Sequence, residues 1–482
     1  MNEKNLSAPE GQLNPETRAE QRARRRWHRY RGKIHRLRSL VFFAALYVLA
    51  FIGLLWFARP ATSVVEKREL TVFPAFTWQG VWDGSWFSDI DTWYSDTYPL
   101  RERLISMDNR LESLYGLRTE QLVSSGEKIA DEIPTDEVDL QALVDARDEA
   151  AAETTPEPEE EIEGKGDVTV LPESFGAVYI ANNCAYDVYY FEQANSAEYC
   201  LLVNQLAEAC EGLADVYCLL SPVASGIMLS DEVRVSLGGS DMKAAMEWMY
   251  TQMDDSVRKV SVYHTLKAHN DEYIFFRTDH HWTALGAYYA YREFCAAKGV
   301  EPHELSCFES LQFDNFLGTF YSASNQSYAL AANPDTITAY IPMGTNEMTM
   351  QVPNGDGTYT EYVWPIVNDV SDYPSSEMYA CFAGSDQPYN YVHNPEITDG
   401  SSILVVKDSY GNAFIPFLVD HYEHIYWIDY RYYTLYCIYR EQEDVSVSAL
   451  VRQEGIQDVL LLNNITAASG DGSMKYFQRL YQ

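Results

Sequence analysis

The chain has 482 residues, of which 46% are hydrophobic and 14% aromatic, so it can bury a large core and is not disordered as a whole. Its net charge of −36 is unevenly spread: residues 1–39 hold 11 Lys or Arg and 4 Asp or Glu, and the remainder holds 24 and 67. So acidic a body excludes nucleic-acid binding by phosphate neutralisation.

The first predicted element is a transmembrane helix. Residues 39–58 contain no charged side chain and are long enough to cross a bilayer. The arm before them, residues 1–38, is basic next to the apolar run, so the positive-inside rule keeps it in the cytoplasm, near anionic lipid headgroups. A cleaved signal peptide is the alternative, although the apolar run and the basic arm are both long for one. We therefore expect a single-pass cell-membrane protein whose main domain is extracytoplasmic.

Two segments of different composition follow. Residues 59–130 form an aromatic juxtamembrane segment, and a short amphipathic helix is predicted where apolar side chains recur at helical spacing, at Phe87, Ile90, Trp93 and Tyr94. Residues 131–167 are rich in Ala, Glu, Asp, Thr and Pro and poor in large apolar residues. Such a composition buries too little surface to offset the entropy of ordering, so a flexible acidic insertion is predicted.

Residues 168–482 alternate predicted strands with predicted helices. The strands are expected at 177–180, 216–220, 260–263, 273–276, 403–406, 425–428 and 459–462, and the helices at 199–213, 242–253 and 413–421. A further helix is expected after Thr283, which can cap its amino end. This alternation predicts an α/β fold, a largely parallel sheet with right-handed crossovers and helices on both faces. Residues 301–399 interrupt the pattern as a β-rich insertion, with a hairpin turn predicted at Asn354 to Gly357.

Two of these predicted strand ends carry side chains suited to catalysis. Asp279 and His281 follow the run at 273–276, and Ser409 follows the strand at 403–406. Open α/β sheets place catalytic groups at the carboxyl ends of their strands. A carboxylate can orient an imidazole, which then acts as a base toward a serine hydroxyl. A helix-capping serine and surface histidines are the alternative, but two such patterns on equivalent strand ends favour a catalytic site.

Other polar residues give weaker signals. Arg431 follows another predicted strand and could bind an anion or a carbonyl oxygen, or simply pair with Asp429. The eight cysteines show neither CxxC spacing nor alternation with histidine, so no metal site and no cofactor are predicted. Their even number permits disulfides outside the cell, but the sequence does not give a connectivity.

Several motifs together resemble the bacterial DHHW family, which is related to the SGNH-like alginate O-acetyltransferases. They are Asp279-His280-His281-Trp282, Gly318-Thr319-Phe320-Tyr321, Lys407-Asp408-Ser409-Tyr410, Asp429-Tyr430-Arg431-Tyr432 and the EKREL to YPLR section at 66–101. The resemblance covers most of the chain beyond the predicted span, without the acidic insertion. In those acetyltransferases an Asp-x-His pair precedes the catalytic serine, whereas in ordinary SGNH esterases the serine comes first.

The resemblance implies an SGNH-like fold with Ser409 as nucleophile, His281 as base and Asp279 as its orienting partner. It gives His280 no role, and it leaves Tyr410, Asn412 and Arg431 as weak candidates for substrate or oxyanion contacts. No cofactor is implied.

The expected function is that of an O-acetyltransferase or acetylesterase that acts on a cell-envelope polysaccharide through an acyl-serine. Because acetyl-coenzyme A is absent outside the cell, a transferase would need a membrane protein partner that delivers acetyl groups. The alternative is a non-catalytic glycan-binding or scaffold protein of the envelope. In that case sugar rings would stack on an aromatic set: Tyr430, Tyr432, Tyr433 and Tyr436.

Overall fold

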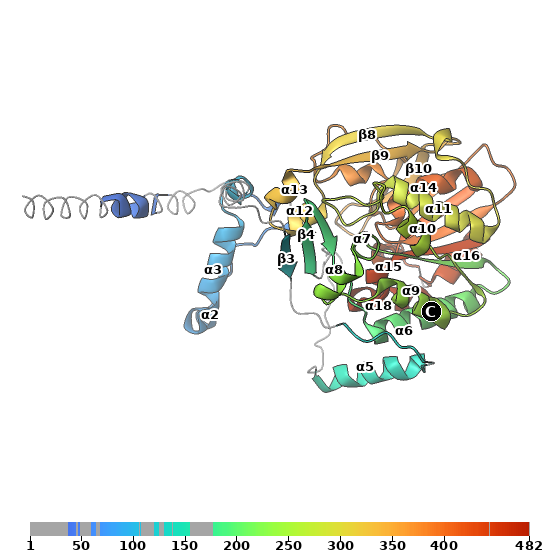
Figure 1. The fold of residues 1–482 in the computed structure, drawn as a ribbon, viewed down its shortest axis with the longest axis horizontal. Coiled ribbons are helices and arrows are strands. Elements are labelled where there is room, and N and C mark those ends of the chain that lie inside the picture. The colour runs from blue at the N-terminus through green and yellow to red at the C-terminus, as the bar shows by residue number, and fades with distance from the viewer. Residues whose placement is uncertain are drawn as a thin grey trace, which may run out of the picture. The chain divides into compact units, whose positions relative to one another are not determined.

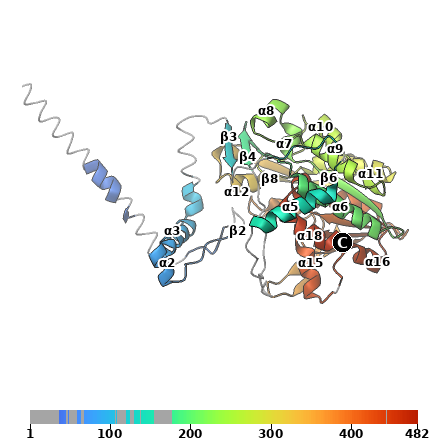
Figure 2. The same cartoon turned by 90° about the horizontal axis from the view of Figure 1, so that it is seen from below.

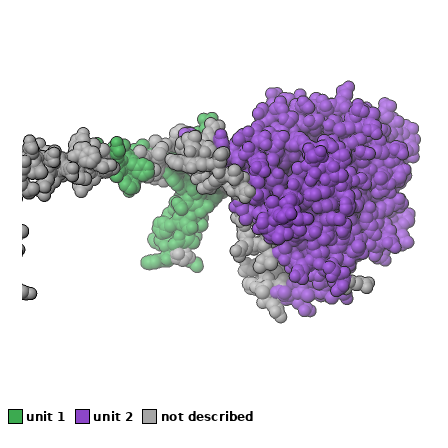
Figure 3. All heavy atoms as spheres, in the orientation of Figure 1, with its two compact units in different colours: residues 1–63, 67–104 green, residues 64–66, 105–482 purple. Residues whose placement is uncertain are grey.

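A computed structural model describes residues 37–44, 47–48, 59–63, 68–105, 107, 120–124, 130–136, 138–154, 177–442 and 444–481. The chain divides into two compact units (Figure 3). The first comprises residues 1–63 and 67–104, and the second comprises residues 64–66 and 105–482.

The first unit contains a two-stranded ribbon and two helices. The ribbon pairs β1 (Thr62–Ser63) with β2 (Arg68–Glu69), and the helices are α2 (Trp78–Asp83) and α3 (Ser85–Asp96). Gly84 joins the two helices with a φ of 87°, a left-handed conformation that glycine adopts without strain. The helix α3 confirms the amphipathic helix that was predicted here.

Most of the predicted transmembrane segment lies outside the described residues, as does the basic arm up to residue 36. Residues 37–44 and 47–48 are helical. Within the described part of the chain, no helix combines the length and the apolar character needed to cross a membrane.

The second unit is built on a mixed sheet of eight strands. Its strands are β6 (Asp215–Ser221), β7 (Val257–Lys259), β10 (Glu347–Pro353), β11 (Tyr359–Pro365), β12 (Asn390–His393), β13 (Ser402–Lys407), β14 (His424–Asp429) and β15 (Asp458–Asn464). Their order is β11-β10-β12-β14-β13-β15-β6-β7. The five strands from β14 to β7 pair in parallel, which confirms the α/β class. The other three are antiparallel, so the sheet as a whole is mixed.

Helices lie on both sides of this sheet. The chain crosses from β13 to β14 through α14 (Gly411–Leu418), and returns to β15 through α15 (Tyr430–Tyr439) and α16 (Val447–Glu454). Because the two crossings run in opposite directions, right-handed connections place these helices on opposite faces. In Figure 1, α14 accordingly lies above α15 and α16.

The remaining helices join one of these two layers. α11 (Ala284–Lys298) packs with α14 and with α10 (Tyr263–Ala268). In the other layer, α6 (Gln193–Ala209) packs with α9 (Met242–Gln252), α17 (Ile465–Ala468) and α18 (Asp471–Tyr481). The short helices α7 (Ala224–Met228) and α8 (Asp231–Ser236) follow β6.

The predicted insertion at 301–399 is β-rich, and it extends the main sheet. Its strands β10 and β11 form the predicted hairpin, and β12 connects them to β14. A separate antiparallel pair joins β8 (Glu309–Phe316) to β9 (Asp335–Ile341). Short helical segments occur at α12 (Thr319–Ala323), α13 (Tyr328–Ala331), η1 (Leu305–Cys307) and η2 (Met378–Cys381).

Three strand predictions need correction. The predicted strand at 177–180 exists as β4 (Ala177–Ala181), but it pairs with β3 (Glu120–Ser124) and β5 (Cys184–Asp187) in a separate antiparallel sheet. The run at 273–276 is a buried loop with one isolated bridge, Phe275 to Trp282, because its aromatic side chains are buried without strand pairing. The predicted strand at 260–263 ends earlier, since β7 stops at Lys259 and α10 begins at Tyr263.

The prediction of a flexible insertion at 131–167 is wrong for residues 140–154, which form the helix α5 (Leu140–Thr154). α5 packs along α6, as Figure 2 shows from below. Val144 is buried in this contact, and Arg147 donates to Asn195 Oδ1 at 2.6 Å and to Glu198 Oε2 at 2.7 Å. These contacts offset the entropy cost of ordering the helix, which the composition of residues 131–167 did not indicate could be met. Residues 155–167 lie outside the described part.

Candidate active site

The loop that carries Asp279 and His281 is fixed at both ends. On one side, Phe276 N donates to His281 O at 3.2 Å, which folds the loop back on itself. On the other side, Thr283 caps α11 by accepting a hydrogen bond from Gly286 N, as predicted. A Cβ on Gly286 would lie 2.4 Å from Ile274 O, so only glycine lets the helix approach the loop this closely. The loop is therefore held against the start of α11.

The middle of this loop is anchored by Asp335, a fully buried residue at the start of β9. Its carboxylate accepts from Arg277 N at 2.9 Å, from Thr278 N at 2.8 Å and from Thr278 Oγ1 at 2.6 Å. Thr278 Oγ1 also accepts from Gly318 N at 3.1 Å. The insertion thus positions the residues that precede Asp279.

Asp279 and His281 form an oriented carboxylate–imidazole pair. Asp279 Oδ1 lies 2.5 Å from His281 Nδ1 and also accepts from His281 N at 3.1 Å. Burial by itself would raise the pKa of Asp279, but the neighbouring His281 and His280 hold it well below its ordinary value. An ionised carboxylate only accepts hydrogen bonds, so Nδ1 carries the proton and Nε2 is the nitrogen able to act as a base.

The second oxygen of Asp279 is held by the Gly318–Thr319 turn. Asp279 Oδ2 accepts from Thr319 N at 2.8 Å and from Thr319 Oγ1 at 3.0 Å. A Cβ on Gly318 would lie 2.2 Å from Asp279 Oδ2, so the close approach requires glycine. Thr319 Oγ1 is also 2.7 Å from His280 Nδ1. The Gly318 to Tyr321 motif therefore has a structural reason: it orients the loop Asp279 to Trp282, called the DHHW loop below.

Ser409 lies at the predicted place, on the turn between β13 and α14. Asp408 holds this turn, because its Oδ1 accepts from Tyr410 N at 3.0 Å and its Oδ2 accepts from Asn464 N at 2.7 Å and Asn464 Nδ2 at 2.9 Å. Burial raises the pKa of Asp408 to about 6. A Cβ on Gly411 would lie 2.7 Å from the Lys407 side chain, so glycine lets α14 begin directly after the turn that carries Ser409.

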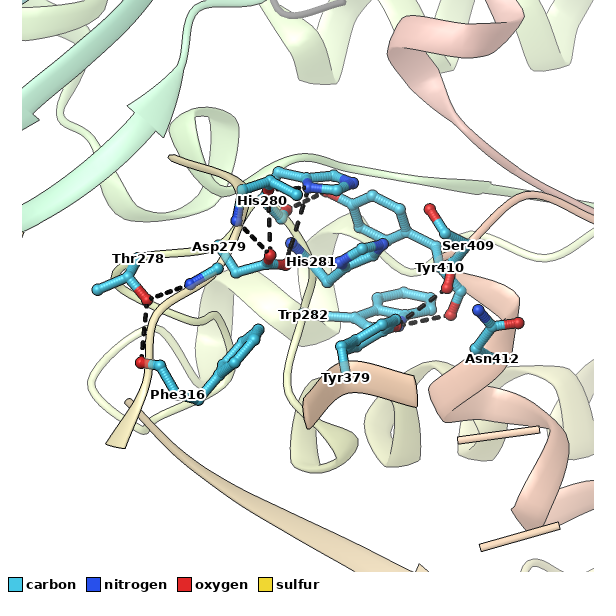
Figure 4. A network of polar contacts seen from close by, with 12 residues as sticks. Thr278, Asp279, His280, His281, Trp282, Phe316, Tyr379, Ser409, Tyr410 and Asn412 are labelled. Atoms are coloured by element: carbon cyan, nitrogen blue, oxygen red, sulfur yellow. Dashed lines mark hydrogen bonds and ion pairs between the residues drawn. The ribbon is translucent and has the colours of Figure 1, made fainter. Parts of the chain in front are cut away.

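Direct contacts tie the DHHW loop to the Ser409 turn. Trp282 Nε1 donates to Tyr410 O at 2.9 Å, and the Tyr410 hydroxyl donates to His280 O at 2.5 Å. Tyr379, in η2, stacks on the His281 ring at 4.0 Å between centroids, and its hydroxyl donates to Ser409 O at 3.0 Å. In Figure 4 the His281 ring lies between Asp279 and the Ser409 turn. The structure therefore brings together the three residues predicted to be catalytic.

The three weaker candidates are engaged in structural contacts. The Tyr410 amide donates to Asp408, and Asn412 Nδ2 donates to Asp386 Oδ1 at 2.9 Å. Arg431 forms a bidentate pair with Asp429, at 2.8 Å for Nε and 2.6 Å for Nη2, and also reaches Asp386 at 2.9 Å. For Arg431 these contacts match the ion-pair alternative. A role of these residues toward substrate remains a prediction.

Sequence reasoning missed the charged network beneath the Ser409 turn and the ring that covers His281. Lys407 is fully buried, with its Nζ 3.3 Å from Asp386 and 3.6 Å from Asp429. Burial would raise the pKa of Asp386, but Arg431 and Lys407 keep it well below its ordinary value. A lysine at the end of an apolar strand was a signal for a buried ion pair. No local signal marked Asp386, which lies in a loop of the insertion, or Tyr379, which lies in its short helix η2.

The Asp279, His280 and His281 side chains each offer a metal-ligating atom within 4.8 Å of the others. Hydrogen bonds already engage both Asp279 oxygens and the Nδ1 atoms of both histidines. The donor set therefore suits an orienting pair better than a metal site. All eight cysteines are free thiols, and six of them are buried in the core.

Comparisons with known proteins agree with this architecture. The model of the family described as DHHW protein matches residues 66–160 and 151–428. A crystal structure of a DHHW family protein from Eubacterium siraeum aligns with a TM-score of 0.54 at 26% identity, over 67% of this chain and 99% of that one. No curated protein matches the chain.

Two structures of Bacillus cereus PatB1, one of them with a sulfonyl adduct, align with TM-scores of 0.51 and 0.50 at 19% and 17% identity, over 63% of this chain and 99% of theirs. This likeness shows a shared α/β fold. The O-acetyltransferase domain of Pseudomonas putida AlgJ aligns at 14% identity over 59% of this chain and 90% of that one, and its TM-score of 0.32 carries no argument. Since the family model spans most of the sequence, this chain belongs to the DHHW family.

Proposed function

We propose that this chain is a membrane-anchored, extracytoplasmic SGNH-like enzyme that transfers acetyl groups to, or removes them from, a cell-envelope polysaccharide. One observation carries the proposal: Tyr379 contacts both the His281 ring and the Ser409 carbonyl, so a base oriented by Asp279 lies at the nucleophile turn. Membership of the DHHW family and the fold shared with PatB1 support it.

The reaction follows from the roles of the three side chains. Ser409 Oγ attacks the acyl carbonyl carbon while His281 Nε2 takes the hydroxyl proton, and ionised Asp279 stabilises the imidazolium through Nδ1. The ester bond between the acyl carbon and the oxygen of the leaving alcohol then breaks, and His281 gives its proton to that oxygen. The acyl-serine next passes its acyl group to a sugar hydroxyl or to water.

The surroundings of the site bear on the choice between transfer and hydrolysis. Ser409 is 5% exposed and His281 is 3% exposed, with the Tyr379 ring lying on the imidazole. A sugar acceptor that binds over these two groups would exclude the remaining water, which favours transfer over hydrolysis. This supports the transferase, for which a membrane protein would deliver the acetyl group to the extracytoplasmic side.

The experiment is labelling of the purified full-length chain with a sulfonyl fluoride, read by peptide mass spectrometry. PatB1 has been seen with a sulfonyl adduct, and sulfonyl fluorides react with activated serine hydroxyls, so this probe tests the same chemistry here. We expect the label on Ser409, none in Ser409→Ala, and labelling slower by on the order of 10³-fold in His281→Ala.

The control is Ser221→Ala, because Ser221 is also a buried serine at the carboxyl end of a parallel strand. Its loss should leave labelling unchanged. Equal labelling of wild type and His281→Ala, or a label on another residue, would contradict the proposal.

The glycan-binding alternative receives little support from the aromatic set on which it depended. Tyr432 is half-buried, and the other three members, Tyr430, Tyr433 and Tyr436, are buried at 2%, 3% and 6% exposure. Their rings pack against aromatic neighbours, with Tyr430 on Phe477 and Tyr436 on Tyr389. These side chains serve packing and do not offer a face to a sugar.

A further inference from the structure

The first unit carries a set of exposed aromatic side chains on the segment before α2, on α2 itself and on the first turn of α3. We define this aromatic strip by Phe73, Phe76, Trp78, Trp82 and Phe87. Trp78 is 72% exposed and Trp82 is 87% exposed, and the three phenylalanines are each more than half exposed. A row of large apolar side chains turned outward is typical of a surface that binds a partner.

The rings of the strip are held by packing against other aromatic side chains of the same unit. Phe73 packs edge-on against Trp93 at 4.8 Å, and Phe76 packs against Trp78 at 5.2 Å and Trp86 at 5.4 Å. At the carboxyl end of α3, Asp96 accepts from Thr71 N at 2.8 Å and from Thr71 Oγ1 at 2.9 Å, which fixes the segment before Phe73 against α3. These contacts hold the outer rings in place.

Arg59 links the carboxyl end of α3 to the predicted membrane exit, because it is the first residue after the apolar run at 39–58, and Trp93 beneath it also packs against Phe73 of the strip. Its guanidinium lies 4.0 Å from the centre of the Trp93 ring, and its Nη1 donates to Thr97 Oγ1 at 2.8 Å and Thr97 O at 3.2 Å. The carboxyl end of α3 is therefore held directly at the point where the chain would leave the bilayer.

We propose that the aromatic strip lies in the interfacial layer on the extracytoplasmic face of the cell membrane, with its rings inserted among the lipid headgroups. This proposal rests on the membrane anchor of the proposed function. The bilayer is the nearest apolar phase to a segment tied at Arg59, and tryptophan prefers the membrane–water interface. Residues 70–100 contain no Lys or Arg and four Asp, so ring insertion, with no electrostatic attraction to anionic lipid, holds the strip.

The test uses the full-length chain in nanodiscs that contain lipids brominated near the top of the acyl chain, since bromine quenches tryptophan fluorescence at short range. Subtracting the emission of a double variant, Trp78→Phe with Trp82→Phe, from that of wild type leaves the emission of these two indoles. Trp56 of the predicted span is present in both proteins, so its emission cancels. We expect brominated lipid to reduce this difference emission by about half or more, because interfacial segments insert about 5–10 Å.

Trp364→Phe is the matched control, because Trp364 is a half-buried tryptophan on β11 in the second unit. Its difference emission should not respond to brominated lipid. High salt should leave the quenching of Trp78 and Trp82 unchanged. Quenching by acrylamide but not by brominated lipid would show that the strip faces water, and protection from both would show that protein covers it; either result overturns the proposal.

Alkaline carbonate extraction of membranes separates this inference from the anchor. If the chain is released without detergent, the anchor fails and the inference fails with it. If the chain is retained while brominated lipid leaves Trp78 and Trp82 bright, only the placement of the strip is wrong. Serine labelling at Ser409 is independent of both outcomes.

Discussion

At the scale of single residues, Asp279 has hydrogen-bond partners at both of its carboxylate oxygens. Its two oxygens divide their roles: Oδ1 faces His281 and Oδ2 faces Thr319. An asparagine keeps this shape but removes the negative charge that sets the imidazole tautomer and stabilises its protonated form. We expect Asp279→Asn to slow sulfonyl labelling of Ser409 by on the order of 10³–10⁴-fold, with the fold retained.

Circular dichroism and the urea midpoint check that the Asp279→Asn protein is folded. Labelling at the wild-type rate would show that His281 needs no carboxylate partner. The proposed mechanism would then lose its orienting group.

Tyr379 makes two separable contacts, one through its ring and one through its hydroxyl. Tyr379→Phe keeps the stack on His281 and loses only the hydrogen bond to Ser409 O, which is worth about 1 kcal/mol, or about fivefold in rate. Tyr379→Leu loses both contacts. We expect the labelling rate to fall in the order wild type, Phe, Leu, with a changed pH profile only in the Leu variant. Identical behaviour of the two variants would show that the ring has no role in holding the imidazole.

At the scale of elements, the sequence was most informative where buried strands end in polar turns. The strands β6, β13, β14 and β15 were predicted within one or two residues, because apolar runs buried on both faces have few alternatives in an α/β chain. The cap at Thr283 was predicted for a similar local reason.

Elements that depend on distant partners could not be predicted. The run at 273–276 has the composition of a strand, yet its neighbours in space leave it only the Phe275–Trp282 bridge. The ion pairs of Lys407 with Asp386 and Asp429 join segments separated by about twenty residues, and nothing local to Asp386 indicates them. The sequence therefore does not indicate that the insertion positions the candidate site; the structure shows this through contacts between distant residues.

The helix α5 gives a prediction at this same scale. An isolated helix of this length is marginal in water, so α5 depends on its packing against α6 through Val144. Val144→Asp buries a charge in that contact and should strongly accelerate amide hydrogen exchange in residues 140–150, with little change in β13 or β15. Ala146→Asp, at an exposed position of the same helix, is the control and should leave exchange slow. Fast exchange in wild type would instead support the flexible segment that composition predicts.

At the scale of the whole molecule, buried carboxyls make stability depend on pH in opposing directions. The lowered pKa of Asp279 contributes stability that is present above the pKa of the unfolded chain and is lost as the pH falls. Asp187 acts in the opposite direction, because burial raises its pKa to about 6 from the ordinary 3.8. Between these two values Asp187 is more fully protonated in the folded state than in the unfolded state, so its contribution to the free energy of unfolding decreases as the pH rises.

Asp187→Asn tests this balance. Asp187 is buried on β5, and its Oδ1 has no hydrogen-bond partner among the described residues, so a neutral amide removes the cost of ionisation and disturbs few contacts. We expect the variant to be more stable than wild type at pH 8, by at most about 3 kcal/mol, and nearly equal to it at pH 4. Urea midpoints at the two pH values measure the difference, and an equal difference between the proteins at both values would exclude Asp187 as the titrating group.

Asp408 supplies the contrast, because burial raises its pKa to a similar value while three N–H donors point at its oxygens. In Asp408→Asn an amide NH₂ would face at least one of those donors, so this variant should be less stable than wild type at pH 8 even though it also removes a buried charge. Opposite signs for two carboxyls of similar pKa would show that hydrogen bonding decides the outcome, and burial alone does not. The ionised Asp408 would then hold the turn that carries Ser409, although burying its charge costs free energy of folding.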